Sequence, residues 1–440
     1  MPAIPVAPPG HLRTISLALS MVRQLLFLVL FLLVCASGRS ADDRLGVCTH
    51  FSQNWDPSAV VPLIARSGFG WIREDIFWKE FEKTKGVYEV PSKVQNWIDL
   101  ANRYGLKICA CISYGNGLYA DQYDPAAYSR FAAWLAQKFA GKIDAIEICN
   151  EPNNDFQSKQ SDWWHKYVNL LNVSAQAIKA VNPQVAVIGL GANPKENYGM
   201  MAIGISPLVD GLTDHPYGWG ILGLMGSESF PSFVNEWRTN ARKYNTTTAM
   251  WLTEWGNSTF TLPSGFVVTE QLQAQWEAAR LIESHALGVE HSFIYVFKDE
   301  SDDPHSNYAN YGLIHTNLAP KRALGTINRV TKLLVGMKPN PQSPQTYDVP
   351  SNFVWQDYRA YRFDAIDGSK AVVALWQASH QGSAVSVKIH QPGAKTVALC
   401  DPVSGKQKLS SFSWDLNDPN TGTVVIRVSV SDAPQLLLVE

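Results

Sequence analysis

The stretch IDAIEICNEP, residues 143–152, combines an apolar run with an abrupt polar end. Residues 143–149 are predicted to form a short buried strand, and Asn150, Glu151 and Pro152 follow it directly. The stretch raises the question whether Glu151 is an ordinary polar residue at the end of a strand or one half of a catalytic pair. The answer depends on what the rest of the chain places beside it.

The same alternation of apolar runs and amphipathic segments extends over about residues 44–335. Seven further runs are predicted to be strands, at 45–48, 68–73, 106–112, 185–190, 209–215, 249–254 and 291–297. Continuous apolar strands separated by helices indicate a parallel sheet that is buried on both faces, and eight such units close as a (β/α)₈ TIM barrel. An open doubly wound sheet is disfavoured because GVCTHFSQN, at the first strand end, contains no glycine-rich phosphate loop.

A second pattern begins beyond a proline-rich break at 336–344. Apolar and polar residues there alternate with period two, as in a β-sheet that is buried on one face, at 358–363, 371–376, 384–389, 424–430 and 435–440. The fold class predicted from the sequence is therefore α/β, with a catalytic barrel over 42–338 followed by a small C-terminal all-β, sandwich-like domain over 345–440.

The N-terminal segment is typical of a targeting sequence. Leu25 to Ala36 is a run of twelve apolar residues, Arg23 supplies a basic flank, and residues 36–38 form a small-residue cleavage site. We expect residues 1–41 to be a signal peptide or an N-terminal anchor, and the protein to be exported to the periplasm or the cell exterior. Met21 is an alternative start residue.

Composition restricts the partners and cofactors. The formal net charge is −2, so nothing favours a nucleic-acid or anionic-membrane partner, and membrane contact is expected only if the N-terminal segment is retained as an anchor. The 15 Trp, 16 Tyr and 18 Phe suit stacking on sugar rings as well as a large core. The six cysteines show neither C-x-x-C pairs nor metal spacing, so we expect buried free thiols, no metal and no cofactor.

In a TIM barrel the active site lies at the carboxyl ends of the strands. The candidate site residues found at or near these ends are His50, Arg73, Asn150, Glu151, His215, Tyr217, Glu254, Trp255 and Phe297. Glu151 after the fourth strand and Glu254 after the seventh would face each other across the barrel mouth. Hydrogen bonds from Tyr217 and Arg73 are expected to stabilise an ionised Glu254, whereas Glu147 is predicted to be structural and paired with Arg73.

Two carboxyl groups in this arrangement point to glycoside cleavage. One protonates the departing oxygen, and the second attacks the anomeric carbon when the two are about 5–5.5 Å apart, which gives a retaining reaction. The amide of Asn150 would bind the sugar 2-hydroxyl, a contact that strengthens as charge develops.

These motifs carry a resemblance to a known group. NEP after the fourth strand, TEWG at the end of the seventh, DHPY after the sixth and the early Arg73 resemble clan A of the glycoside hydrolases. Within that clan, GVCTHF, IREDIFWKEFEKTKGVYEV and FKDES are most similar to bacterial endoglycosidases related to family 39, which include exopolysaccharide-degrading enzymes. The resemblance implies that Glu151 is the acid/base, Glu254 the nucleophile and Asn150 the partner of the 2-hydroxyl.

One departure from the clan pattern concerns the end of strand eight. Many members place a tryptophan there to floor the sugar subsite, whereas this chain has IYVFKDE. Phe297 or Tyr295 is expected to take that place.

Two alternatives to a glycosidase stay open at this point. The first is a carbohydrate-binding or catalytically degenerate barrel, against which the presence of both glutamates argues. The second is a metal-dependent barrel hydrolase using His50, His215 and Asp214, which no short-spaced ligand pair supports. The C-terminal domain is expected to be a structural appendage, with glycan binding as the alternative.

Overall fold

The computed structural model describes residues 41–155, 162–218, 230–377, 382–415 and 422–440. The predicted signal or anchor segment, residues 1–41, lies outside this range except for Ala41. In the described part of the chain, no helix combines the length and the apolar character that a membrane crossing needs.

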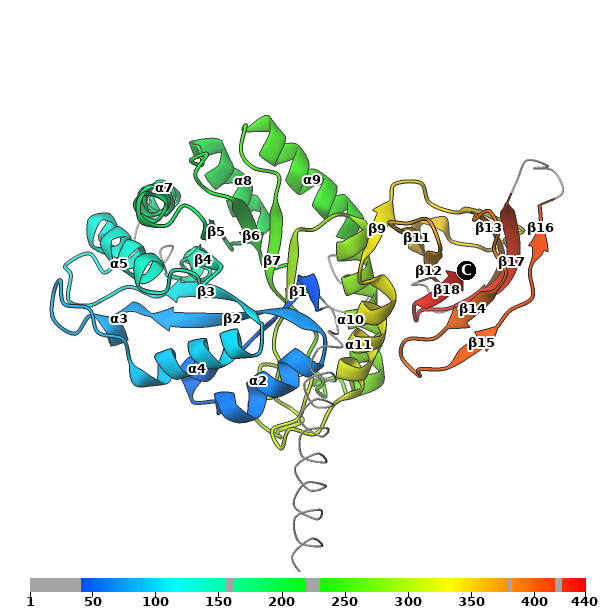
Figure 1. The fold of residues 1–440 in the computed structure, drawn as a ribbon, viewed down its shortest axis with the longest axis horizontal. Helices are drawn as coiled ribbons and strands as arrows, with labels where there is room; N and C mark the ends of the chain where they lie inside the picture. Colours follow the sequence, from blue (N-terminus) through cyan, green and yellow to red (C-terminus); the bar gives the residue numbers. More distant parts are fainter. Residues whose placement is uncertain (1–40, 156–161, 219–229, 378–381, 416–421) are drawn as a thin grey trace, which may run out of the picture. The chain divides into compact units, whose positions relative to one another are not determined.

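The predicted barrel is confirmed. Eight parallel strands pair in chain order and close between the last and the first: β1 (Asp42–Cys48), β2 (Phe69–Phe77), β3 (Lys107–Ser113), β4 (Ala145–Ile148), β5 (Ala186–Leu190), β6 (Gly211–Asp214), β7 (Met250–Trp255) and β8 (His291–Ile294). The principal helices around them are α2 (Pro57–Arg66), α4 (Ser92–Arg103), α5 (Pro125–Lys138), α7 (Trp163–Val181), α8 (Pro194–Ile203), α9 (Phe230–Lys243), α10 (Glu270–Ala286) and α11 (Arg322–Leu334). Figure 1 shows these helices surrounding the strands.

Two helix starts show how local sequence sets the pattern. Asp56 accepts a hydrogen bond from the Ser58 amide and Asp124 from the Ala127 amide, and each aspartate is followed by a proline at the first helical position. The side chain satisfies an amide that the helix leaves unpaired, and proline has no amide to lose. Both starts are where the sequence predicted them.

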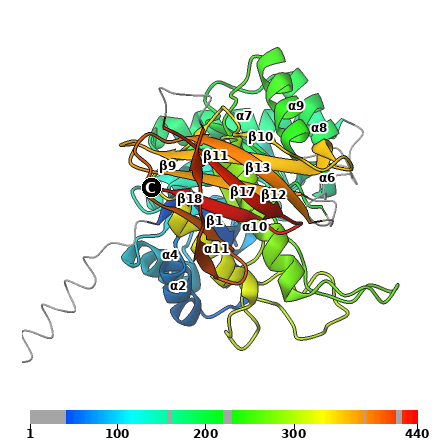
Figure 2. The same ribbon diagram turned by 90° about the vertical axis from the view of Figure 1, so that its right-hand side faces the viewer.

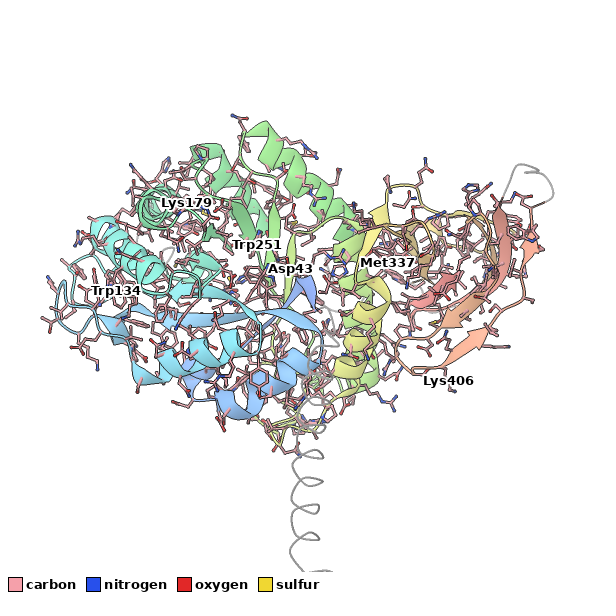
Figure 3. All side chains as sticks on the ribbon, viewed as in Figure 1. Asp43, Trp134, Lys179, Trp251, Met337 and Lys406 are labelled. Carbon is pink, nitrogen blue, oxygen red and sulfur yellow. The ribbon has the colours of Figure 1, made fainter. Side chains whose placement is uncertain are left out.

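The amino-terminal end of the barrel is closed by aromatic packing. Trp251 on β7 contacts the rings of Trp71, His291 and Phe293, at centroid distances of 5.6, 3.9 and 6.3 Å. Trp251 and the nearby strand β1 residue Asp43 are labelled in Figure 3. This packing fills the interior from below, so the polar residues of the opposite end lie above a solid core.

The C-terminal domain consists of two antiparallel sheets, as predicted. One has the order β10 (Gln345–Tyr347), β13 (Ser383–His390), β17 (Thr423–Val430) and β16 (Ser413–Trp414). The other has the order β15 (Gln407–Leu409), β14 (Val397–Cys400), β18 (Gln435–Val439), β12 (Ala371–Gln377), β11 (Tyr358–Ala365) and β9 (Met337–Asn340). These strands face the viewer in Figure 2. Strand β9 lies inside the predicted proline-rich break and pairs with β11.

The cysteine prediction is also confirmed for the described residues. Cys48, Cys109, Cys111, Cys149 and Cys400 are all buried and free. Cys35 lies outside the described part of the chain.

Candidate active site

Arg73 on β2 is the centre of the polar cluster in the barrel. Its Nε donates to Glu147 Oε2 at 2.6 Å, Nη1 to Glu254 Oε1 at 2.7 Å and Nη2 to Asn150 Oδ1 at 2.8 Å. The side chain is only 4% exposed. Burial opposes the charge of Arg73, but Glu147, Cys111 and Glu254 outweigh it and raise its pKa well above the ordinary value. Arg73 therefore stays charged, and the expected pairing of Arg73 with Glu147 is confirmed.

Glu254 is held by two donors and lies beside a third. Tyr217 donates its hydroxyl to Oε2 at 2.8 Å, and Arg73 donates to Oε1. Nδ1 of His215 lies 3.8 Å from Oε2. Both expected contacts, from Tyr217 and from Arg73, are present, and both stabilise an anionic carboxylate.

Glu151 follows β4 in an unusual backbone conformation. Its φ is +40°, and that of Cys149 is +68°, so two non-glycine residues adopt the left-handed region within three positions. His215 Nδ1 lies 2.9 Å from Oε1, and Asn154 Nδ2 donates to Oε2 at 2.5 Å. Burial raises the pKa of Glu151, but the hydrogen bond from His215 and the positive charges of His215 and Arg73 together outweigh burial, and the net shift is downward.

His215 links the two glutamates to the barrel interior. Its Nε2 lies 3.1 Å from the hydroxyl oxygen of Thr253, and that hydroxyl donates to Glu147 Oε1 at 2.8 Å. Burial lowers the pKa of His215, but the charges of Glu254 and Glu151 outweigh burial and raise it above the ordinary histidine value. His215 therefore binds its second proton more readily than an isolated histidine.

Thr253 is a site residue that sequence reasoning missed. It precedes Glu254, and neighbours on a regular strand point to opposite faces of the sheet. Strand β7 is irregular here, because Leu252 pairs with Ser292 and Trp255 with Ile294, so three steps on β7 oppose two on β8. An extra residue on one of two paired strands is a β-bulge. The bulge lets both Thr253 and Glu254 contact groups inside the barrel.

Asn150 is oriented by Arg73. Because its Oδ1 accepts from the guanidinium, its NH₂ group is the part that remains for a substrate hydroxyl. The structure thus brings Asn150, Glu151, Arg73, His215 and Glu254 together, as the strand ends predicted.

His50 lies at another part of the mouth. Its Nδ1 is 2.5 Å from Glu300 Oε1, and its ring contacts Trp55 and Tyr295 at centroid distances of 5.2 and 5.6 Å. Burial lowers the pKa of His50, but the hydrogen bond to Glu300 and the charges of Glu300, Glu74 and Asp75 together outweigh burial, and the net shift of this pKa is upward. The His50–Glu300 pair therefore lies beside aromatic rings. Such a pair can hydrogen-bond to sugar hydroxyls, and aromatic rings can stack on the faces of sugar rings.

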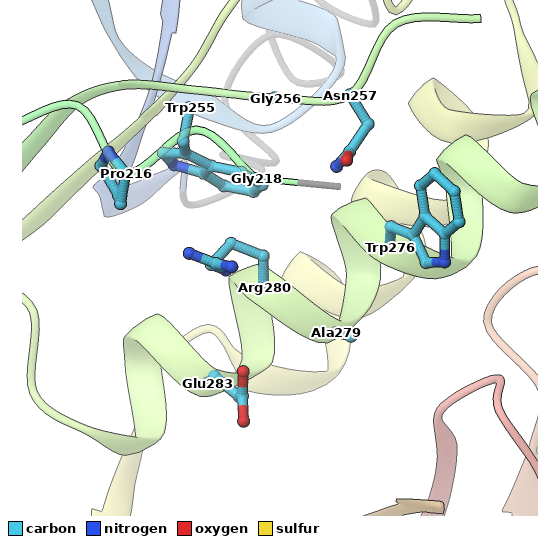
Figure 4. Close-up of a pocket in the computed structure, with 9 residues that line it drawn as sticks. All are labelled: Pro216, Gly218, Trp255, Gly256, Asn257, Trp276, Ala279, Arg280 and Glu283. Carbon is cyan, nitrogen blue, oxygen red and sulfur yellow. The ribbon is translucent and has the colours of Figure 1, made fainter. Parts of the chain in front are cut away.

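The predictions for Trp255 and Phe297 as substrate contacts are wrong in this structure. Trp255 is 1% exposed and donates to Ser292 Oγ, so its ring points out of the barrel. Figure 4 shows it above Arg280 of α10, in a cavity of about 10 Å³ that has room for about one water molecule. Phe297 is 0% exposed and packs against Phe69.

Tyr295 is the aromatic residue that the strand-eight segment supplies to the mouth. Its ring lies edge-on to Tyr217 at 6.1 Å and to Tyr311 at 5.6 Å. Strand β8 ends at Ile294, three residues before the predicted end, so Tyr295 rather than Phe297 directly follows it. Of the two expected substitutes for the missing tryptophan, Tyr295 has the suitable position.

A metal site is not what the contacts favour. Glu151, His215 and Glu254 are the group of possible ligands found among the described residues, and one atom of each lies within 4.8 Å of the others. These atoms already pair with one another or with Arg73 and Tyr217. The alternative set of His50, His215 and Asp214 does not form such a group in the described part of the chain.

Comparisons with known proteins show the family of this chain. The family model described as Cellulase (glycosyl hydrolase family 5) matches residues 37–292, which is more than half of the 440 residues. The comparison with curated proteins finds no match.

Two solved structures illustrate the likeness in fold. A family 39 glycoside hydrolase from the gut symbiont Bacteroides cellulosilyticus WH2 superposes with a TM-score of 0.71 at 22% identity, over 91% of this chain and 81% of that chain. A GH30 endoxylanase from Clostridium papyrosolvens C71 gives a TM-score of 0.60 at 13% identity, over 91% of this chain and 98% of that chain.

The resemblance to clan A predicted from the sequence is confirmed by these matches, which include a family 39 structure although the matching sequence model is that of family 5. The protein belongs to the cellulase family, glycosyl hydrolase family 5, and is a glycosidase.

Proposed function

We propose that the protein is a retaining glycoside hydrolase that cleaves β-linked polysaccharide or oligosaccharide, with Glu254 as nucleophile and Glu151 as acid/base. The observation that carries the proposal is the spacing of the two carboxylates, since one oxygen of each lies within 4.8 Å of the other. Retaining glycosidases place these groups about 5–5.5 Å apart, whereas inverting enzymes need about 6.5–9.5 Å to admit a water molecule.

The first step forms a glycosyl ester. Glu254 attacks the anomeric carbon while Glu151 gives its proton to the glycosidic oxygen, so the carbon–oxygen bond breaks and the leaving group departs as an alcohol. Arg73 and Tyr217 orient Glu254 for this attack and stabilise it as an anion. Arg73 keeps its position during this step, because it also donates hydrogen bonds to Glu147 and Asn150.

The second step returns the enzyme to its starting state. Glu151, now a carboxylate, takes a proton from water, and the resulting hydroxide attacks the anomeric carbon and releases Glu254. Two displacements at the same carbon leave the product with the configuration of the substrate.

The assignment of roles is tested with activated aryl β-glycosides and added azide. In Glu254→Ala, azide fills the space of the lost carboxylate and attacks the anomeric carbon directly, which gives an α-glycosyl azide. In Glu151→Ala the glycosyl ester still forms, and azide attacks it to give a β-glycosyl azide. Without azide, we expect the Glu151 variant to lose about 10²–10⁴-fold in turnover of substrates with poor leaving groups.

A matched control is Glu236→Gln, which changes an exposed glutamate on α9 and is expected to leave turnover unchanged. Near-normal activity in either active-site variant, with circular dichroism showing a folded protein, would refute the assignment. Binding of glycan without any cleavage by the wild type would favour the carbohydrate-binding alternative.

The substrate class is proposed from the chemistry and from the relatives together. The family is described as Cellulase, and the GH30 neighbour is described as an endoxylanase, so both names concern β-linked polysaccharides. A screen over defined β-linked polysaccharides, with product sizes read by mass spectrometry, tests this. Products of several lengths would indicate internal cleavage, and monosaccharide alone would indicate terminal cleavage.

We also propose that the protein is exported, because residues 25–36 have the length and the basic flank of a signal-peptide core. N-terminal sequencing of the expressed protein tests the proposal. A mature protein that begins near residue 39 supports export with cleavage, retention of residues 21–38 in a membrane fraction supports an anchor, and an uncleaved protein in the cytosol contradicts both.

A further inference from the structure

We propose that Thr253 and Glu147 hold His215 in a single tautomer, so that His215 and Glu151 share one proton and His215 stores the proton that acid catalysis requires. The proposal rests on the assignment of Glu151 as acid/base. Thr253 and Glu147 would be positioning residues, because they act through His215 and not on the substrate.

The tautomer follows from counting hydrogens along a chain of contacts. Oε2 of Glu147 accepts a hydrogen bond from Arg73 Nε at 2.6 Å, and Oε1 of Glu147 lies 2.8 Å from the Thr253 hydroxyl. A carboxylate paired with a guanidinium only accepts, so the single hydroxyl hydrogen of Thr253 points to Glu147. Thr253 therefore presents a lone pair to His215 Nε2 at 3.1 Å, and Nε2 must carry a hydrogen.

The second ring nitrogen is then the one that exchanges protons. Nδ1 of His215 lies 2.9 Å from Glu151 Oε1, with one proton for the two atoms. Either an imidazolium faces a carboxylate, or a neutral imidazole faces a carboxylic acid. The total charge is the same in both states, so the proton moves between them without any other group changing.

The charges around His215 decide where the proton is stored. Glu151 and Glu254 face Nδ1, at 2.9 and 3.8 Å, and Glu147 acts through Thr253. Arg73 opposes these carboxylates, and Asp214, the preceding residue, is bound by Asn197. The pKa of His215 is raised and that of Glu151 is lowered, which both place the proton on His215 before substrate binds.

Substrate binding would then load the acid. The side chain of Glu151 is 29% exposed, so water stabilises the ion pair in the free enzyme. A sugar that covers Glu151 removes this water, and a low dielectric favours the neutral pair. The proton then moves from Nδ1 of His215 to Glu151, and Glu151 gives a proton to the glycosidic oxygen. His215 stays neutral until the second step, in which Glu151 takes a proton from water and the pair again shares one proton.

The test is nuclear magnetic resonance of protein labelled with ¹⁵N in histidine, which needs no substrate. The ring signals of His215 are identified by their loss in His215→Asn. In the wild type we expect Nε2 to carry hydrogen at every pH and only Nδ1 to titrate. A wild-type ring whose neutral form carries its hydrogen on Nδ1 overturns the proposal, whatever the variants do.

The variants isolate the threonine hydroxyl. Thr253→Val removes the acceptor of a charge-assisted hydrogen bond, so the pKa of the ring should fall by about one pH unit or more. Thr253→Ser keeps the hydroxyl and should retain the wild-type titration. Thr213→Val is the matched control, because Thr213 is a buried threonine on the neighbouring strand β6 whose hydroxyl has no hydrogen-bond partner among the residues that the structure describes. An unchanged titration in Thr253→Val overturns the proposal.

Kinetics give an independent reading. In kcat/KM against pH, the basic limb reports loss of the proton shared by Glu151 and His215. We expect Thr253→Val to move this limb to lower pH by about one unit and the serine variant to restore it. A variant that only lowers the height of the curve would show a structural role for Thr253 and contradict proton storage. Failure of Glu151 as acid/base would instead show in the azide experiment, with the resonance result unaffected.

Discussion

Replacing Arg73 by methionine is expected to destabilise the protein by about 3–5 kcal/mol, because it leaves buried carboxylates without their partner. Arg73 makes hydrogen bonds of 2.6, 2.7 and 2.8 Å to Glu147, Glu254 and Asn150. Glu147 is 0% exposed, so water cannot replace the lost guanidinium. The cost is therefore that of an unpaired buried charge, and it exceeds the loss of one ordinary hydrogen bond.

The measurement is urea unfolding followed by tryptophan fluorescence, compared through the midpoint and slope of each transition. The double variant with Glu147→Gln is expected to recover about 1–3 kcal/mol relative to the sum of the single changes, since it also removes one buried charge. The control is Lys142→Met, which breaks a pair with Asp99 that is equally short at 2.6 Å but 45% and 41% exposed. It should cost less than about 1 kcal/mol.

Two results would refute this reasoning. One is a cost for Arg73→Met no larger than that of the exposed control. The other is strict additivity of the Arg73 and Glu147 changes, which would mean that the two side chains do not stabilise each other.

Three further predictions concern Tyr217, Glu277 and the cysteines. Tyr217→Phe removes the hydroxyl bonded to Glu254 and should lower kcat/KM about 10- to 100-fold with little change in unfolding midpoint; an unchanged kcat/KM would contradict the contact's role. Burial raises the pKa of Glu277 to about 8, so its carboxyl binds a proton in the folded protein at a pH where the unfolded chain has lost it. The stability from this proton is complete below pH 4.5 and is lost as pH rises to 8. Glu277→Gln should therefore flatten the decline in unfolding free energy between pH 5 and 8. Parallel curves of unfolding free energy against pH for the wild type and the variant would contradict this prediction. The five described cysteines are buried, so a thiol reagent should label them only after denaturation, and fast labelling of any of these five in the native protein would contradict their burial.

The barrel could be predicted because its pattern is repeated. Each strand is a short apolar run. Helix starts such as Asp56-Pro57 and Asp124-Pro125 can be recognised from the two residues themselves. A parallel sheet with both faces covered leaves few other arrangements for that pattern. Glu151 and Glu254 followed, since the carboxyl ends of barrel strands meet at one mouth.

What the sequence did not predict depends on local departures from regular strands. The bulge in β7 turns Glu254 inward beside Thr253, although alternation would separate them. Because β8 ends early, at Ile294, Tyr295 lies at the barrel mouth and Phe297 lies in the core. Asn154 and Glu300 contact site residues from positions beyond strand ends, where no periodicity indicates a direction.

The configuration of the first product tests the central claim most directly. Hydrolysis of a β-linked substrate found in the polysaccharide screen is followed by proton resonance from the first minute, before the released sugar mutarotates. One oxygen of each carboxylate lies within 4.8 Å of the other, which is closer than the about 6.5–9.5 Å that inverting enzymes need to admit a water, so the β-anomer should form first. Initial formation of the α-anomer would contradict the double displacement through Glu254.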